Sequence, residues 1–385
     1  MEFNAFQNNK LLKYLLENKE WDLFKFSDVF LDNTKLARKI KKEDYLEVGK
    51  YPIIDQGKKY IAGYTNDIDG IYDEEGIIFG DHTRIIKYVN FPLFLGADGT
   101  KLLGVKLKKD IVNIKYLYYF LKTIELPSDG YSRHFKYLKD IIIAIPNIKI
   151  QNKIVEVLDM SYKLIENRKK QIKELDLLVK SKFIEMFGDL KYNSKKWSIL
   201  NFNDFAVIDT NMTKDFETYK EYPHIGIDSI EKNTGNILEY SLVKDCNLKS
   251  GKYIFDERHI IYSKIRPNLN KVALPNFKGL CSADSYPILC NKGIIERIYL
   301  GYVLRSEFFL NYILNFSGRT NIPKINKEQL KGFNMPVPPI ELQNQFADFV
   351  KQVDKLKFEM EKSLKGLEYN FNSIMQKAFN GELFN

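Results

Sequence analysis

The chain has 385 residues and a formal net charge of +9 at pH 7, enough polypeptide for two to three domains with sizeable cores. The excess of lysine and arginine favours an acidic partner, with nucleic acid as the first candidate; a general lysine bias of the proteome is the alternative. Three cysteines are too few and too unevenly spaced for a disulfide framework or a zinc site. No apolar run approaches the length of a membrane span and no signal peptide is recognisable, so a cytoplasmic protein without membrane association is expected.

The first part of the chain alternates short β-type runs with glycine and polar turns. Residues 5–18 form a candidate amphipathic helix to which no role is assigned. Between Trp21 and Ile145 the pattern predicts a globular unit of strands with one longer helix. We expect strands at 51–55, 76–80, 84–89 and 101–107, and a helix at 114–123.

A long helix is predicted next, because Ile150–Phe187 contains neither proline nor glycine and repeats apolar residues at heptad spacing. Such a sustained repeat is typical of a coiled-coil helix, here roughly 55 Å long. The predicted seam consists of Ile154, Leu158, Ile165, Ile172, Leu175, Val179 and Met186, interrupted by Ser161, Arg168 and Lys182.

The same plan then occurs a second time. Trp197–Val337 repeats the globular part, and a second long helix follows in which position 346 corresponds to position 154, an offset of 192. This offset holds through the helices but drifts from 171 to 192 in the globular parts, so the copies differ by insertions in loops, where specificity usually resides. Gly188 and Gly381 follow the two helices and are expected to cap them. The second seam consists of Phe346, Val350, Val353, Lys357, Met360, Leu364, Leu367, Phe371, Ile374 and Ala378.

Signatures of catalysis are scarce in this sequence. A glycine-rich methyltransferase cofactor loop and a GxxxxGK[ST] phosphate-binding loop are both missing. The four histidines are scattered, which favours loop or packing roles over metal binding, and no nucleophile–histidine arrangement stands out. We therefore expect no metal site, no cofactor and no catalytic residue in this chain.

Basic and polar loops at matching places of the two globular parts are the candidate DNA contacts. Arginine, lysine, asparagine and serine grip phosphates and read base edges. Solvated turns without a ligand are the alternative for any one residue, but repetition of the loops in a basic chain favours contact with double-stranded DNA. In the first part the candidates are His82, Thr83, Arg84, Thr100, Lys101, Ser132, Arg133 and His134. In the second part they are Ser263, Lys264, Arg266, Asn268, Lys271, Ser285, Arg319 and Thr320.

The order globular unit, long helix, globular unit, long helix resembles the specificity (S) subunits of type I restriction–modification systems over essentially the full length. Local sequence similarity adds to the resemblance. One small departure is Asn147, which stands where the second copy has a second proline. The fragments concerned are GDHTRIIKYVNFPLFLGADGTKLL (80–103), YSRHFKYLKDIIIAIP (131–146), LVKSKFIEMFGD (178–189) and VPPIELQNQF (337–346).

The resemblance implies an α+β fold: a tandem repeat of two globular α/β target recognition domains separated by two long antiparallel coiled-coil helices, with pseudo-twofold symmetry. The expected boundaries are 1–147 and 191–338 for the recognition domains, and 148–190 and 339–385 for the spacer helices. Each recognition domain is expected to read half of a split DNA target. The helices are expected to dock two methyltransferase (M) subunits, which restriction (R) subunits join. S-adenosylmethionine, ATP and Mg²⁺ are expected on those partners.

Other interpretations stay open at this point. The chain could serve a related system in which one other polypeptide both methylates and cleaves, or it could be a coiled-coil scaffold that binds no DNA. An unrecognised enzyme is a further class. A salt-dependent DNA shift separates the scaffold from a DNA reader, and methyltransferase activity of the isolated chain would reveal the enzyme.

Overall fold

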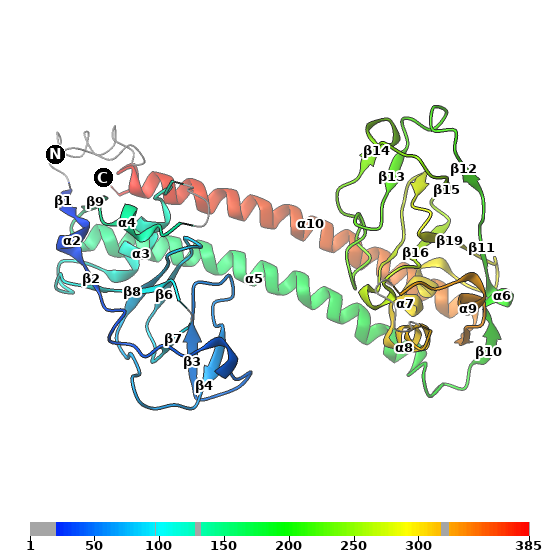
Figure 1. Ribbon diagram of the computed structural model, residues 1–385, viewed down its shortest axis with the longest axis horizontal. Helices are drawn as coiled ribbons and strands as arrows, with labels where there is room; N and C mark the ends of the chain where they lie inside the picture. The colour runs from blue at the N-terminus through cyan, green and yellow to red at the C-terminus, as the bar shows by residue number, and fades with distance from the viewer. Residues whose placement is uncertain (1–20, 97, 128–131, 317–322, 385) are drawn as a thin grey trace. The chain divides into compact units, whose positions relative to one another are not determined.

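The structure, a computed structural model, describes residues 21–96, 98–127, 132–316 and 323–384 (Figure 1). The candidate helix at 5–18 lies outside the described residues. The chain divides into two compact units. Unit 1 comprises Met1–Lys169 with Lys362–Asn385, and unit 2 comprises Lys170–Glu361.

Unit 1 contains a four-stranded antiparallel sheet in the order β2-β8-β5-β6 and a three-stranded sheet in the order β4-β3-β7. A separate antiparallel pair, β1 with β9, leads into the long helix α5 (Ile148–Phe187). The elements before α5 are β1 (Asp22–Lys25), α2 (Phe26–Val29), β2 (Phe30–Asp32), a 3₁₀ turn (Lys42–Asp44), β3 (Tyr51–Ile54), β4 (Gly63–Thr65), β5 (Gly76–Gly80), β6 (Ile86–Val89), β7 (Phe94–Leu95), β8 (Thr100–Val105), α3 (Ile114–Lys122), α4 (Phe135–Leu138) and β9 (Ile142–Ile145).

Unit 2 repeats this topology with a larger second sheet. Its four-stranded sheet has the order β11-β19-β16-β17, its five-stranded sheet the order β12-β15-β18-β13-β14, and β10 pairs with β20. The elements are β10 (Ser198–Asn201), α6 (Phe202–Phe205), β11 (Ala206–Ile208), β12 (Met212–Thr213), β13 (Pro223–Ile225), β14 (Ser241–Leu242), a 3₁₀ turn (Val243–Asp245), β15 (Lys252–Phe255), β16 (His259–Ser263), a 3₁₀ turn (Pro267–Leu269), β17 (Val272–Ala273), β18 (Gly279–Cys281), β19 (Ser285–Cys290), α7 (Arg297–Arg305), α8 (Glu307–Leu314), α9 (Lys327–Lys331), β20 (Asn334–Val337) and the long helix α10 (Ile340–Phe379).

The strand β5 lies between two cores in unit 1, since all five of its residues are buried. Successive side chains of a strand point to opposite faces. Ile77 and Phe79 therefore pack in the core that contains α3, whereas Ile78 packs with the sheet of β3 and β7. In unit 2, β16 has the same alternation: Ile260 faces α7 and Ile261 faces the second sheet. The predicted strand at 76–80 is confirmed, and its wholly apolar sequence follows from burial on both faces.

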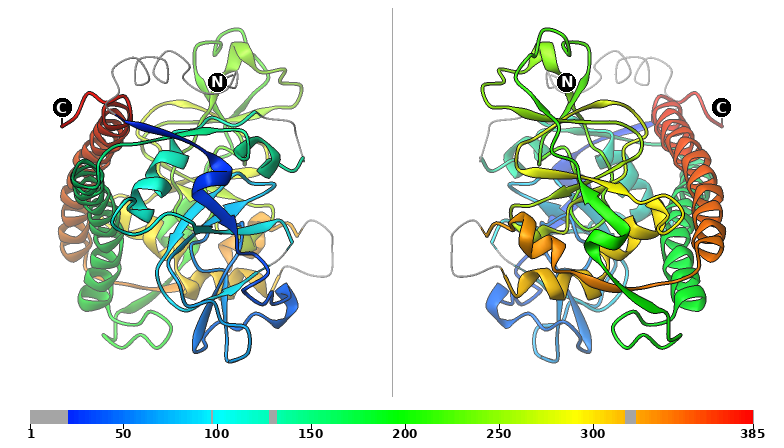
Figure 2. Two further views of the ribbon diagram at one scale, coloured as in Figure 1. Left: turned by 90° about the vertical axis from the view of Figure 1, so that its left-hand side faces the viewer. Right: turned by 90° about the vertical axis from the view of Figure 1, so that its right-hand side faces the viewer.

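The helices α5 and α10 run antiparallel in each unit (Figures 1 and 2). Residues with higher numbers in α5 contact residues with lower numbers in α10. The residues of both predicted seams are buried or half-buried, which confirms the coiled-coil pattern. Gly188 follows α5 with φ +75° and Gly381 follows α10 with φ +71°, as expected of left-handed helix caps. The contacts in order along α5 are Tyr162–Phe371 and Lys169–Glu368 in unit 1, and Asp176–Lys357 and Phe183–Phe346 in unit 2.

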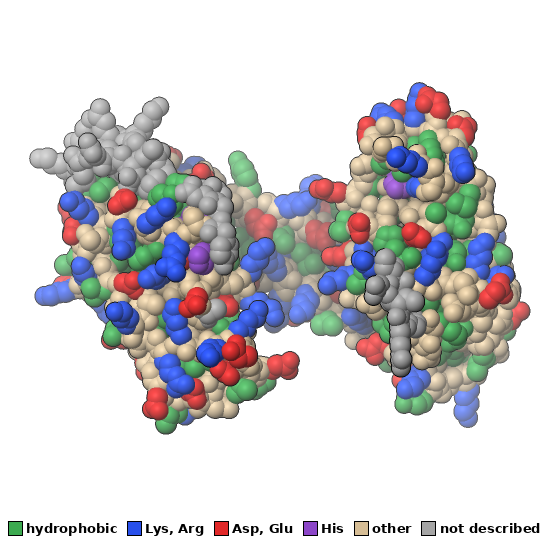
Figure 3. All heavy atoms as spheres, viewed as in Figure 1, with side chains coloured by type: hydrophobic (Ala, Val, Ile, Leu, Met, Phe, Trp, Pro, Cys, Tyr) green, Lys and Arg blue, Asp and Glu red, His purple; other side chains and the backbone are tan. Residues whose placement is uncertain are grey.

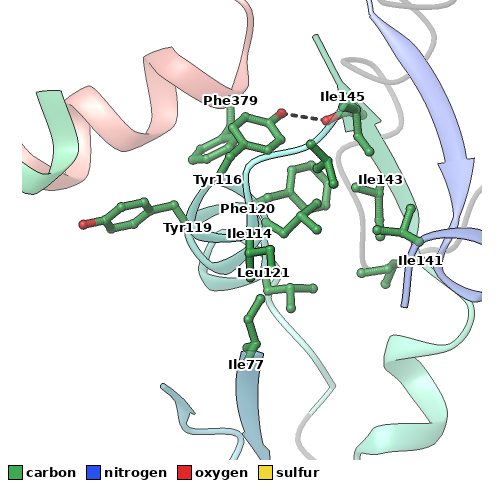
Figure 4. Close-up of a cluster of buried hydrophobic side chains, with 14 of the residues drawn as sticks. Ile77, Ile114, Tyr116, Tyr119, Phe120, Leu121, Ile141, Ile143, Ile145 and Phe379 are labelled. Carbon is green, nitrogen blue, oxygen red and sulfur yellow. Dashed lines mark hydrogen bonds between the residues drawn. The ribbon is translucent and has the colours of Figure 1, made fainter. Parts of the chain in front are cut away.

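Each globular core is closed by the last turn of the helix from the other half of the chain. In unit 1, Phe379 at the end of α10 packs on Tyr116 of α3, with ring centroids 5.3 Å apart (Figure 4). In unit 2, Phe187 at the end of α5 packs on Tyr299 of α7 at 4.7 Å. The compact units consequently cut across the four expected domains, because half of each helix belongs to each core.

A buried glutamine in the first turn of each long helix ties that helix to its own globular part. The Gln151 side chain accepts a hydrogen bond from the Asn113 backbone N–H and donates to the carbonyls of Ile111 and Pro146. Gln343 makes the equivalent three bonds, to Glu296, Ile294 and Pro338. Every polar atom of these amides thus has a partner, as burial requires. Among the described residues, no helix combines the length and apolar character that crossing a membrane requires.

Candidate nucleic-acid interface

The candidate loops of unit 1 meet at one end of its four-stranded sheet. We call the four-stranded sheet of each unit its central sheet. The turn between β5 and β6 begins at Asp81, whose backbone N–H donates to the Gly99 carbonyl at 2.7 Å. Its carbonyl accepts from the His134 backbone N–H at 2.8 Å, and its buried carboxylate accepts from the Phe135 N–H at 2.8 Å. Three loops distant in sequence are thereby joined into one surface, which we call the unit 1 loop cluster (80–84, 98–101 and 132–135).

Some predicted residues of this cluster are exposed. Thr83, Arg84 and Arg133 are exposed, and His82 and Ser132 are half-buried. Arg84 has φ +60°, and its guanidinium donates to the Leu126 carbonyl at 3.2 Å. The exposed arginines, in particular Arg133, can therefore meet a ligand directly.

Other predicted residues of the unit 1 loop cluster are buried or are engaged by another residue of the protein. Thr100 and His134 are each 1% exposed, because Thr100 begins the central strand β8 and the His134 Nδ1 lies 3.0 Å from the Asp81 carbonyl. Lys101 pairs with Asp32 at 3.0 Å. Thr100 and His134 are therefore supports of the loops rather than surface contacts, and we correct their predicted role accordingly.

Unit 2 gathers its loops at the corresponding end of its central sheet. The Lys264 backbone N–H donates to the Asp284 carbonyl at 3.0 Å, and the Lys264 carbonyl accepts from the Ile325 N–H at 2.8 Å. The Arg266 N–H donates to the Pro323 carbonyl at 2.8 Å. We call this surface the unit 2 loop cluster (263–271, 282–285 and 323–325).

The predicted side chains of unit 2 divide in the same way. Arg266, with φ +48°, and Asn268 are exposed. Ser263 and Ser285 face each other across β16 and β19 and are 3% and 0% exposed, so they too support the fold rather than the surface. The Lys271 ammonium is used internally, since it donates to the Ile227 carbonyl at 2.8 Å. Arg319 and Thr320 lie outside the described residues.

Lysines missed by sequence reasoning add positive charge to the unit 2 loop cluster. Lys324 lies beside Asp284, with 3.8 Å between ammonium and carboxylate. Burial lowers the pKa of Lys264 from its ordinary value, and the charge of Lys324 lowers it further. The Lys264 ammonium also lies 5.1 Å from the centre of the Tyr286 ring. The short segment PKINK (323–327) offered no signal by itself, because its proximity to Lys264 arises only when the chain folds.

On the face shown in Figure 3, neither unit gathers its positive charge in one basic patch. In the view of Figure 3, lysine and arginine side chains are interspersed with acidic ones on both units. Within the described residues, no group of three histidine, cysteine or carboxylate side chains could hold a metal ion. The arrangement offers hydrogen-bonding and cationic groups on loops that a rigid sheet positions, which is a means of binding a ligand.

Comparison with known proteins agrees with the architecture. The family described as the type I restriction modification DNA specificity domain matches residues 18–177 and again 189–368. The chain is 27% identical to the EcoDI specificity subunit of Escherichia coli, over 71% of each chain. It is 23% identical to the MjaVIII specificity subunit of Methanocaldococcus jannaschii, over 100% of this chain and 97% of the relative.

Solved structures share the fold. The S subunit of a type I restriction–modification system from M. genitalium matches with a TM-score of 0.58 and 16% identity, covering 98% of both chains. A chain from a structural study of complex assembly in the type I system matches with a TM-score of 0.52 and 14% identity, covering 94% of this chain and 98% of that one. With the family matching both halves of the repeat, the chain belongs to the specificity subunits of type I restriction–modification systems.

Proposed function

We propose that this chain is a non-catalytic subunit that selects the DNA target of a type I complex, each unit reading one half of a split, asymmetric sequence. The proposal rests on one observation: both units hold a loop cluster at the same end of the same central sheet, but the loops differ in sequence and length. Equal scaffolds with different loops favour two different half-sites.

Cations of these clusters are the proposed DNA contacts: exposed arginines and the half-buried Lys264. Arg84 and Arg133 in unit 1, with Lys264 and Arg266 in unit 2, are the side chains we expect to bind phosphates or guanine edges; Arg319 remains a proposal from sequence alone. Alanine at a base-reading arginine should cost roughly 1–3 kcal/mol of binding free energy and relax one target position. Lys109 and Lys292 are matched controls, because they are exposed lysines that follow β8 and β19, at the far ends of these strands from the clusters.

The outer faces of the long helices are the proposed docking surface for two M subunits. Large apolar side chains exposed on a helix surface favour a protein partner. In unit 1 these are Met160, Tyr162, Leu164 and Tyr369, and in unit 2 they are Leu177, Leu178, Ile184, Leu356 and Phe358. We further propose that R subunits join through M, that S-adenosylmethionine binds M, and that ATP and Mg²⁺ bind R, all in the cytoplasm.

Methylation mapping tests the proposal. The chain is co-expressed with the neighbouring methyltransferase gene in a host without DNA methylation, and the genome is sequenced with reads that detect modified bases. We expect a motif of two different halves around a fixed gap, present only with this chain. An absent motif, or a continuous motif that does not depend on the chain, would contradict DNA reading and return the scaffold to consideration.

A further inference from the structure

Gln56 lies at the centre of the unit 1 loop cluster although it belongs to none of the three loops. It follows β3, and its side-chain Nε2 donates to the Asp98 carbonyl at 2.7 Å. Its Oε1 accepts from the His82 backbone N–H at 3.1 Å, and its own carbonyl accepts from the Thr83 hydroxyl at 2.7 Å. One residue thus connects the β5–β6 turn with the loop that precedes β8.

Close packing shows that both loops are built around this side chain. A Cβ atom added at Gly99 would lie 2.7 Å from the Gln56 Nε2 and 2.6 Å from the His82 ring. A Cβ atom at Gly80 would clash with the Thr83 hydroxyl and would lie 2.9 Å from the Gln56 Cβ. Real Cβ contacts are longer, so no side chain fits at either glycine unless Gln56 moves together with His82 or Thr83.

The loop that carries Gln56 is fixed from below by a buried lysine of the sheet. The Lys87 ammonium, on β6, donates to the carbonyls of Asp55 and Lys59 at 2.6 Å each. Burial lowers the pKa of Lys87, and the Asp55 carboxylate at 3.7 Å opposes this shift. The position of Gln56 is therefore set by the scaffold before any DNA is bound, which is the condition for a preorganised surface.

Unit 2 has no equivalent amide. Gln56 stands five residues after Tyr51, and the residue five positions after the matching Tyr222 is Ile227. An isoleucine side chain can neither donate nor accept a hydrogen bond. There the Ile227 carbonyl accepts from the Lys271 ammonium at 2.8 Å. The glutamine link is a property of unit 1.

We propose that Gln56 is a positioning residue that sets target discrimination in one half-site by holding two loops of the unit 1 loop cluster in register. The proposal rests on the proposed function, because it assumes that this cluster reads DNA. With the amide in place, the backbone of His82 and Thr83 has one fixed position relative to the sheet. The position of Arg84, the next residue, is fixed as a consequence. Without it, both loops can adopt several positions that bind DNA but tolerate a wrong base.

Two substitutions separate the hydrogen bonds from the packing. Gln56→Met keeps the length of the side chain and removes the amide. Gln56→Glu keeps an acceptor for the His82 N–H but turns an oxygen toward the Asp98 carbonyl where a donor is needed. Each variant is assembled with M subunits, and methylation rates are measured on the cognate target and on targets with single-base changes in either half. Binding to unrelated DNA is measured across salt concentrations, and thermal unfolding is recorded.

Within one half of the target, we expect Gln56→Glu, which loses one hydrogen bond, to lose up to about tenfold in discrimination, and Gln56→Met, which loses two, to lose at least as much. Discrimination in the other half and the salt dependence of non-specific binding should equal those of the wild type. Full discrimination in the Met variant would overturn the proposal, as would an equal loss in both halves, which indicates general destabilisation. If the wild-type complex itself recognises no split target, the proposed function fails, and that outcome is visible without any variant.

Discussion

Replacing Phe379 by alanine should destabilise unit 1 and leave unit 2 unaffected, although Phe379 is more than 200 residues away in sequence from the globular part of unit 1. The ring is 4% exposed and lies 5.3 Å from the Tyr116 ring and 5.8 Å from the Phe120 ring. Truncating a buried phenylalanine costs about 3–5 kcal/mol, of which the two aromatic pairs supply about 1–3 kcal/mol. A loss of that size corresponds to a fall in the melting temperature of roughly 10 °C for a unit of this length.

Hydrogen exchange followed by mass spectrometry gives the spatial resolution that this prediction needs. Peptides from α3 and β9 should exchange on the order of a hundredfold to several thousandfold faster in Phe379→Ala, while those from α7 and β20 keep their protection. The matched control is Phe187→Ala, whose ring packs on Tyr299 and Phe346 and should give the opposite pattern. Equal loss of protection in both units, or none in α3, would refute the assignment of the end of α10 to the first core.

Three further predictions concern the helices and their attachment. Gln151→Leu leaves one backbone N–H and two carbonyls without partners and should lower the free energy of unfolding by about 3 kcal/mol; a loss below about 1 kcal/mol in urea denaturation would contradict it. Burial raises the pKa of the Glu296 carboxyl above its ordinary value of 4.5, against the pull of the first N–H groups of α7. Because the folded pKa exceeds the unfolded one, the charged carboxyl destabilises the protein above the folded pKa, and this cost fades as pH falls toward 4.5. Any stability that Glu296→Gln gains over the wild type at neutral pH should therefore shrink as pH falls through this window. A difference in the free energy of unfolding that does not depend on pH would be inconsistent with this prediction. Inserting four residues near the middle of both α5 and α10 lengthens each by about 6 Å, close to two base pairs of rise, so methylation mapping should find a wider target gap; an active variant with the original gap would exclude the helices as a ruler.

Local patterns predicted much of the fold. The wholly apolar strand at 76–80, the heptad seams and the capping glycines were each read from a few neighbouring residues, and the structure confirms them. Such features depend on the periodicity of side chains along one element, which the order of residues already contains. Repetition extended the reach of these patterns, since the same elements were read twice.

The candidate site was predicted less completely. The loops could be predicted because they recur in both units. The sequence did not predict which of their side chains face solvent. Thr100 and Ser285 stand at the starts of central strands and are buried there, and the Lys271 ammonium donates a hydrogen bond to the Ile227 carbonyl. Sequence also gave no reason to select Gln56, because a single glutamine after a strand has no distinctive pattern.

The sequence by itself determined the repeat, the long helices, several central strands and the family, since these follow from residue order and local periodicity. Only the tertiary structure decided that Phe379 completes the first core and that Gln56 joins the loops near His82 and Asp98. Both contacts link positions far apart in the chain. Their existence depends on how packed elements bring side chains together in space, and no short stretch of sequence records it.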